Sequence, residues 1–131
     1  MAVDIKVATQ EINSWLDYKK VKAAPKETYK AQIDTLIQAV CDGELTINAT
    51  TFELSQTLNC PVPELDLTVL KYVPRLTIGE MRKASVNVKP TDFDGKCIAT
   101  IAAATGKAMS HLDKMDSSDY NTAQAIAVFF M

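Results

Sequence analysis

The sequence predicts an α+β protein that is mainly α-helical with a small β element: an N-terminal helical hairpin, then short strands, then C-terminal helices. Apolar residues recur at helical spacing near both ends of the chain, and β-branched residues gather in the middle. The 131 residues are 47% hydrophobic and can build a real core, because a chain of this size buries roughly two-thirds of its unfolded surface. Pro61 and Pro63 interrupt the pattern, so we expect an N-terminal unit over residues 1–60 and a second region over residues 61–131.

The N-terminal hairpin is predicted from two helical patterns joined by a short link. The first covers residues 9–20, and Thr9 is placed to cap it. The second covers residues 21–43, with Pro25 in its first turn and Gly43 placed to end it in a left-handed conformation. Each helix has an apolar stripe, formed by Ile12, Trp15 and Leu16 in the first and by Tyr29, Ile33, Leu36, Ile37 and Val40 in the second.

Short strands are expected on both sides of a proline-containing break. Residues 44–48 are rich in β-branched side chains, which predicts the first strand. Residues 56–66 contain both prolines of the break and are our candidate linker. Leu65–Val73 alternates between apolar and polar residues and predicts another strand, which Pro74 stops.

Two helices and a short turn are predicted after the strands. Thr77 opens the first of these helices, and Glu80, three residues later, completes a capping box. Thr91 is the expected cap of the next helix, which Gly106 ends. Residues 109–115 are expected to form one or two helical turns.

The final predicted helix covers residues 117–130 and has Asp116 or Ser117 as its cap. The stretch AIAVFFM, residues 125–131, is apolar without a break. One interpretation is that it packs on the helix predicted over residues 92–105 and completes the core. The other is that it docks on an amphipathic helix of another chain, or continues into an extension of a longer product. The two interpretations are compatible, because one face can pack while another stays available.

The charge of the chain is small overall but unevenly distributed. The formal net charge is −2, so no bulk field favours nucleic acid or acidic lipid. Residues 31–60 contain no Lys or Arg, whereas residues 1–30 carry a cluster of lysines at positions 19, 20, 22, 26 and 30. The favoured interpretation is that neighbouring elements complement each other; the alternative is a nucleic-acid surface.

The residues that usually carry chemistry lack convergent partners. His111 is the single histidine, and the three cysteines form no CxxC pair, which predicts free thiols in a reducing cytosol. Asp113, Asp116 and Asp119 could gather around a cation, but Asp116 and Asp119 also fit a helix start. We therefore expect no catalytic residue, no cofactor and no metal, and a protein that is not an enzyme. No run approaches the ~18 apolar residues of a membrane span.

Two stretches carry a pattern known from one protein family. Residues 72–85 read YVPRLTIGEMRKAS, close to a Pro-Thr-x-Gly-Asp/Glu-Leu/Met element. Residues 101–130 run through an apolar helix, Thr-Gly, a turn with spaced Leu and Met, Asp-x-x-Asp-Tyr and a helix ending near two Phe. In both stretches, and in the strand-like residues 52–72, the chain resembles the tail assembly chaperones of long-tailed bacteriophages. The positions that match the closing pattern are Thr105, Gly106, Leu112, Met115, Asp116, Asp119, Tyr120, Phe129 and Phe130.

The resemblance implies a non-enzymatic chaperone that coats the long, largely helical tape-measure protein and helps gather tail-tube subunits around it. It implies work in the host cytoplasm and absence from the mature virion. From the small net charge and the lack of a long apolar run, we expect no nucleic acid and no membrane as partners. The expected protein-binding side chains are Tyr120, Ile126, Phe129, Phe130 and Met131. Self-association into a homo-oligomer stays open. The alternatives are a structural virion protein, such as a connector or baseplate subunit, and a nucleic-acid-binding regulator that uses Lys19–Lys30.

Overall fold

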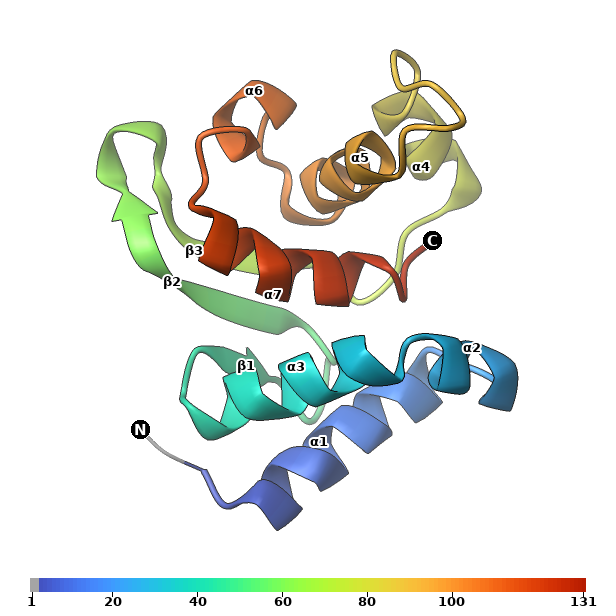
Figure 1. Ribbon diagram of the computed structural model, residues 1–131, viewed down its shortest axis with the longest axis vertical. Helices are drawn as coiled ribbons and strands as arrows, with labels where there is room; N and C mark the ends of the chain where they lie inside the picture. The colour runs from blue at the N-terminus through green and yellow to red at the C-terminus, as the bar shows by residue number, and fades with distance from the viewer. Residues whose placement is uncertain (1–2) are drawn as a thin grey trace.

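The computed structural model describes residues 3–131, and it is mainly α-helical with a small antiparallel sheet, as the sequence predicts. Within these residues the helices are α1 (Ile5–Tyr18), α2 (Ala23–Thr28), α3 (Lys30–Cys41), α4 (Ile78–Ala84), α5 (Phe93–Thr105), α6 (Met109–Leu112) and α7 (Ser117–Ala127). The strands are β1 (Leu45–Ile47), β2 (Leu54–Val62) and β3 (Leu67–Tyr72), and a short 3-10 turn, η1 (Pro63–Leu65), joins β2 to β3. Figure 1 shows α1, α2 and α3 at one end of the molecule, α4, α5 and α6 at the other, and α7 between them.

The sheet has the strand order β1-β2-β3, and both pairs are antiparallel. Leu45 pairs with Gln56 and Leu54 pairs with Tyr72, and all four side chains are buried on one face of the sheet. Lys71, which points to the opposite face, is exposed. Helix α3 contacts β1, α7 contacts β2 and α5 contacts β3, so three helices lie in a row over the buried face.

Helix α1 begins earlier than the sequence predicts. Its cap is Asp4, whose carboxylate accepts a hydrogen bond from the Lys6 N–H at 2.7 Å. The cap expected at Thr9 is wrong, because Thr9 lies inside the helix and its hydroxyl donates to the Ile5 carbonyl at 2.7 Å. Asp is a strong capping residue, and it comes five residues before Thr9 in the sequence.

The second predicted helix is interrupted. Helices α2 and α3 are separated by Tyr29, whose backbone leaves the helical conformation with φ −105° and ψ 29°. The Tyr29 ring lies 5.8 Å from the ring of Phe129, a residue at the other end of the chain. Gly43, with φ 78°, ends α3 in the left-handed conformation as predicted.

Most of the expected linker, residues 56–62, is a strand, and the rest is the turn that contains η1. Residues 56–62 belong to β2, so the boundary expected between residues 60 and 61 falls inside a strand that pairs with both of its neighbours. The pairing of β2 with β3 is irregular between Thr57 and Val62, and such an irregularity accommodates Pro61, which has no N–H for the ladder. The strands predicted near residues 44–48 and 65–73 are confirmed as β1 and β3. One cluster of buried apolar side chains includes residues from both sides of the expected boundary.

The capping box predicted for α4 is confirmed. The Thr77 hydroxyl accepts from the Glu80 N–H at 3.1 Å, and the Glu80 carboxylate accepts from the Thr77 N–H at 3.1 Å. The cap expected at Thr91 is wrong by one residue, because the Asp92 carboxylate accepts from the Gly95 N–H at 2.9 Å and starts α5 instead. Gly106, with φ 75°, ends α5 as predicted.

Helix α7 starts where the sequence predicts but ends earlier. The Asp116 carboxylate accepts from the Ser118 N–H at 3.0 Å and caps the helix. The predicted end at residue 130 is wrong, because α7 stops at Ala127 and the chain continues in a tighter turn. In that turn the Phe129 N–H donates to the Ile126 carbonyl at 3.2 Å, a bond that spans three residues rather than four.

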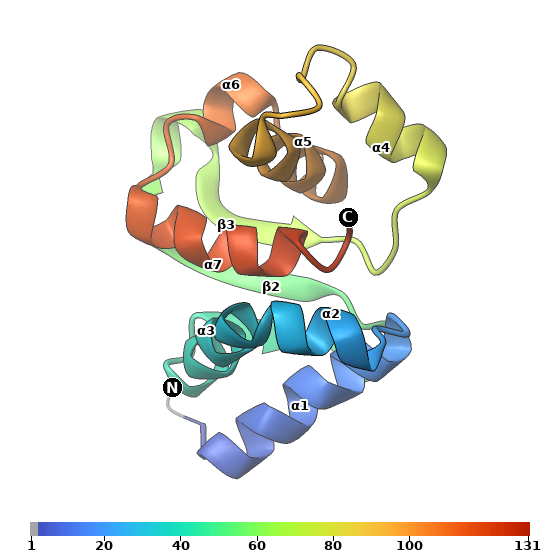
Figure 2. The ribbon, with the colours of Figure 1, turned by 45° about the vertical axis from the view of Figure 1, so that its right-hand side comes forward.

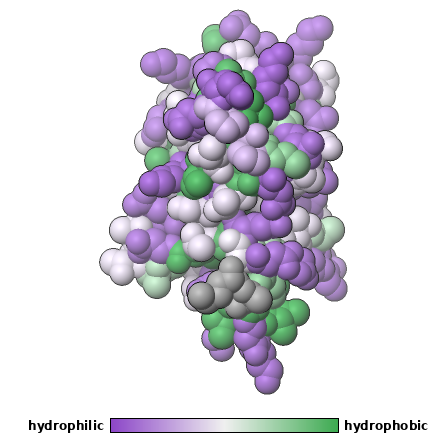
Figure 3. Space-filling model, turned by 90° about the vertical axis from the view of Figure 1, so that its left-hand side faces the viewer, coloured by the Kyte–Doolittle hydropathy of each residue, from purple (hydrophilic) through white to green (hydrophobic). Residues whose placement is uncertain are grey.

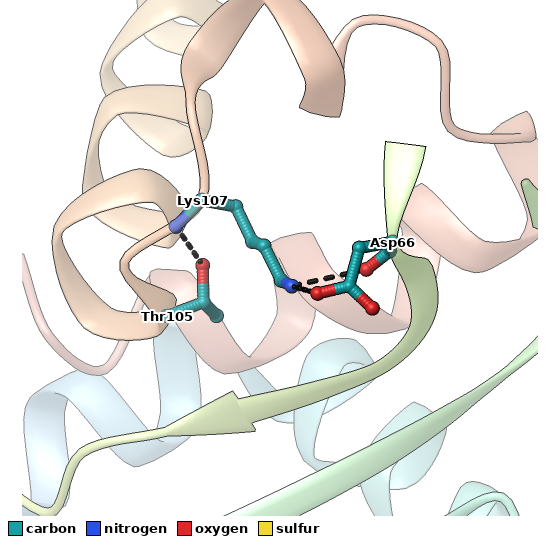
Figure 4. A network of polar contacts seen from close by, with 3 residues as sticks. All are labelled: Asp66, Thr105 and Lys107. Carbon is teal, nitrogen blue, oxygen red and sulfur yellow. Dashed lines mark hydrogen bonds and ion pairs between the residues drawn. The ribbon is translucent and has the colours of Figure 1, made fainter. Parts of the chain in front are cut away.

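The turn between β2 and β3 is tied to the end of α5, as Figure 4 shows. The Lys107 Nζ donates to the Asp66 carboxylate at 2.9 Å and to the Asp66 carbonyl at 3.0 Å. The hydrogen bond from Lys107 holds the pKa of the Asp66 carboxyl below its usual range. Because the Asp66 side chain is exposed, this ion pair orients the turn more than it stabilises the fold.

Candidate protein-binding site

The C-terminal segment, residues 126–131, divides into a buried part and an accessible part. Ile126 is fully buried, so its side chain is not accessible to a partner in this structure. Phe129 and Phe130 are half-buried, and Met131 is 49% exposed. The sequence could not separate these residues, because all of them belong to one unbroken apolar stretch.

The two phenylalanines pack mainly against the N-terminal helices. The Phe129 ring meets the Trp15 ring of α1 edge-on, with 5.8 Å between ring centroids, and the Phe130 ring lies 6.4 Å from the same indole. Met131 turns the other way, towards α5, where its Sδ lies 4.0 Å from the Cys97 Sγ. The C-terminal segment therefore touches both ends of the molecule, in agreement with its position in Figure 2.

One residue of the lysine cluster is engaged with the C-terminal segment. The Lys19 Nζ lies 3.6 Å from the centroid of the Phe130 ring and donates to the Pro74 carbonyl at 3.1 Å. Burial, and secondarily the charge of Arg75, lowers the pKa of Lys19 to about 8. Lys26 pairs with Asp17 at 3.6 Å. Two of the five clustered lysines are thus partly engaged within the chain rather than free for a nucleic-acid backbone.

Tyr120 lies at a different place from the other expected binding residues. Its hydroxyl donates to the Asp94 carboxylate at 3.1 Å, and burial is the main cause of its raised pKa. The ring lines a hollow of about 300 Å³ between α5, α6 and α7, which we call the acidic hollow. Its lining residues are Asp94, Ile98, Leu112, Asp113, Met115, Ser117 and Tyr120.

Sequence reasoning singled out Tyr120 but missed Asp94 and Ile98. Leu112 and Met115 belong to the closing pattern described in the sequence analysis. The signal that could have found Asp94 and Ile98 is their i, i+4 spacing on one side of the predicted helix. That spacing places both residues towards the same neighbour. Only the packing of α5 against α6 and α7 shows which neighbour it is.

Two of the three spaced carboxylates serve the fold. Asp116 caps α7, and the buried Asp119 carboxylate accepts from the backbone N–H groups of Asn59 and Cys60 at 2.8 and 2.9 Å. No group of three potential ligands that could hold a metal ion occurs among residues 3–131. His111 is exposed at the end of α6. In the same described part of the chain, no helix combines the length and the apolar character needed to cross a membrane.

A second apolar region lies at the start of α1, at the end of the molecule far from the acidic hollow, and the sequence did not predict it. Ile5 and Val7, at the start of α1, are 63% and 45% exposed. Figure 3 shows hydrophobic surface gathered at this end, next to the grey residues, on a face that is otherwise largely hydrophilic. A hollow of about 310 Å³ between α1 and the β1–β2 turn opens there, lined by Val7, Gln10, Glu11, Ser14, Ile47, Ala49 and Phe52.

Comparison with protein-family models, with curated proteins and with solved structures finds no match for this chain. The chain's own residues are therefore the guide to its function. They offer apolar surface at several places, and within residues 3–131 no cluster of potential metal ligands accompanies it.

Proposed function

We propose that this chain is a non-enzymatic tail assembly chaperone, which binds and solubilises a tape-measure protein in the host cytoplasm and helps recruit tail-tube subunits. Two observations support the proposal. Residues 72–85 and 101–130 follow the order of residue types that such chaperones share. The same part of the chain folds into α4, α5, α6 and α7, helices that carry accessible apolar side chains.

The observation that carries the proposal is the apolar surface around the C-terminal segment. Met131 is 49% exposed, and its sulfur contacts Cys97 of α5. Phe93, one turn before Cys97 on the same side of α5, is 47% exposed. We call Phe93 and Met131, with the half-buried Phe129 and Phe130, the C-terminal apolar surface.

This surface suits an amphipathic helix better than a polar ligand. A helix that lays its apolar face on such a surface gains affinity from buried area, roughly 25 cal/mol for each Å² removed from water. Such binding depends little on the exact sequence of the client. A chaperone that covers a very long helical protein needs this tolerance, because it meets many different segments of the client.

The test is co-expression with the long helical protein encoded by the same phage. We expect the soluble fraction of that protein to rise when the wild-type chain is present. The double variant Phe93→Asp, Met131→Asp should lose this effect while keeping its circular dichroism spectrum, because both side chains are about half exposed. Ile5→Asp, on the distant start of α1, is the matched control and should keep the effect.

Two results would contradict the proposal. If the client's solubility is unchanged with the wild-type chain, the chain is not its chaperone. If mass spectrometry finds the chain as a stoichiometric component of finished particles, it is a structural virion protein, because a chaperone leaves before assembly ends.

A further inference from the structure

The acidic hollow combines an apolar floor with negative charge at its rim. Ile98 of α5, Leu112 of α6 and Met115 supply the floor, and Met115 adds a flexible side chain that adapts to what it meets. The two charged lining residues, Asp94 and Asp113, are both acidic and both exposed. The hollow therefore suits a large apolar side chain that has a cationic neighbour.

Asp94 and Asp113 come from different sides of the hollow. Asp94 stands in the first turn of α5, where the Tyr120 hydroxyl holds its carboxylate. Asp113 follows the last residue of α6. A cation one helical turn from an inserted apolar side chain lies within reach of this rim.

Helix α4 and the turn that follows it present this combination. Ile78 and Val86 are 77% and 76% exposed, the two highest values among the large apolar residues of the described chain. Arg82 lies one turn after Ile78, and within residues 3–131 neither Arg82 nor Lys83 forms an ion pair. We call Ile78, Arg82, Lys83 and Val86 the α4 edge.

The other strongly exposed apolar position has no excess of positive charge beside it. Ile5 lies between Asp4 and Lys6, whose opposite charges offset each other, and Val7 on the same turn lines the hollow that contains Glu11. The single acidic residue of α4, Glu80, has its carboxylate engaged by the Thr77 N–H in the capping box. Charge complementarity therefore selects the α4 edge over the start of α1.

We propose that the acidic hollow receives the α4 edge of a second copy of this chain, with Ile78 in the hollow and Arg82 near Asp94 and Asp113. The contact cannot form within one copy, because α4 and α6 lie on opposite sides of α5 in both Figure 1 and Figure 2. It is head-to-tail: each copy offers one α4 edge and one acidic hollow. Repetition of such a contact builds a ring or an open array rather than stopping at a dimer.

This proposal is independent of the chaperone function, because it concerns only the chain's own two surfaces. It is tested by sedimentation velocity of the purified full chain over a range of concentrations. The wild-type average mass should rise with concentration and pass that of a dimer. Ile78→Asp removes the α4 edge, Asp113→Lys reverses the rim charge, and each variant should stay monomeric, with association weakened at least about tenfold.

The decisive step mixes the two variants. The Ile78→Asp chain keeps its acidic hollow and the Asp113→Lys chain keeps its α4 edge, so the mixture should form a one-to-one dimer that grows no further. Ile5→Asp and Asp34→Lys make the same chemical changes at other exposed positions and should associate like the wild type.

Three outcomes would overturn the proposal. A wild-type chain that is monomeric at every concentration shows that the hollow does not receive a second copy. Variants that associate as well as the wild type show that copies meet through another surface. A mixture that stays monomeric shows that the two surfaces are not partners.

Discussion

Lys19 is the residue at which three distant segments of the chain meet. Its ammonium group lies over the Phe130 ring and donates to the Pro74 carbonyl, while Arg75 beside it places its guanidinium 4.6 Å from the centre of the Tyr18 ring. Burial of the ammonium and repulsion by Arg75 lower its pKa from 10.5 to about 8. The Lys19 ammonium group thus lies against the Phe130 ring in surroundings that disfavour its charged form.

The lowered pKa of Lys19 predicts a pH dependence of stability with a definite sign. Between about pH 8 and pH 10.5 the unfolded chain binds more protons at this residue than the folded chain, so stability rises with pH across this window. We expect the free energy of unfolding of the wild type, relative to Lys19→Met, to increase by about 1 to 2 kcal/mol between pH 7 and pH 10.

The measurement is urea unfolding of both proteins at the two pH values under reducing conditions. Both proteins carry the same thiols and tyrosines, so any contribution of these groups cancels in the difference. A difference that is flat with pH would show that Lys19 is charged equally in the folded and unfolded states, and a difference that falls would show that folding raises its pKa.

At the scale of elements, Asp119 joins α7 to β2. Its carboxylate accepts from the N–H groups of Asn59 and Cys60, in the part of β2 where the pairing with β3 is irregular. The backbone carbonyl of Asp119 accepts from the Gln56 side-chain amide at 3.0 Å. The side-chain oxygen of Gln56 in turn accepts from the Tyr72 hydroxyl at 2.7 Å. The helix is therefore attached to the sheet by a buried polar network as well as by apolar packing.

The hydrogen bonds between α7 and β2 predict a large loss of stability for Asp119→Ala. The substitution leaves two partly buried backbone N–H groups without their acceptor, and we expect a loss of about 2 to 3 kcal/mol in the free energy of unfolding. Asp116→Ala, which removes only the exposed cap of the same helix, should cost about 1 kcal/mol. Chemical denaturation measures both, and an Asp119→Ala cost no larger than that of Asp116→Ala would contradict this account.

The elements also show which parts of the fold the sequence could predict. The capping box at Thr77 and the left-handed end at Gly106 depend on residues within one turn of each other, and both are confirmed. The strand through Pro61 depends on an irregular pairing with β3 and on a carboxylate about 60 residues away, so local patterns indicated a linker instead. Helix caps are local in sequence, whereas bulged strands are stabilised by distant partners.

The candidate site likewise has features that the sequence could predict and features that depend on distant contacts. The apolar character of residues 126–131 was visible in the sequence, but the full burial of Ile126 and the exposure of Met131 depend on how α7 lies against α3 and α5. Asp94 joins the acidic hollow only because α5 packs beside α6 and α7. Residue types indicate that some apolar surface is available to bind protein. Where that surface lies depends on how the helices pack, which the sequence does not show.

At the scale of the whole molecule, α7 and the C-terminal segment link the two ends. Helix α7 contacts α3 on one side and α5 on the other, in agreement with its central position in Figure 2. Phe129 and Phe130 then reach Trp15 of α1. Residues 1–60 and 61–131 thus share one buried cluster, although the sequence suggested two units.

The shared cluster predicts that the chain unfolds in a single cooperative step. Trp15 is the single tryptophan, and it reports on the contact between α1 and the C-terminal segment, whereas far-ultraviolet circular dichroism reports on all helices. We expect the two signals to give the same midpoint in urea. Phe129→Ala removes a half-buried aromatic ring from this contact, and it should lower both midpoints together, with a loss of about 2 kcal/mol. If tryptophan fluorescence changes well before circular dichroism, the two ends of the molecule unfold independently and Phe129 acts only as a local contact.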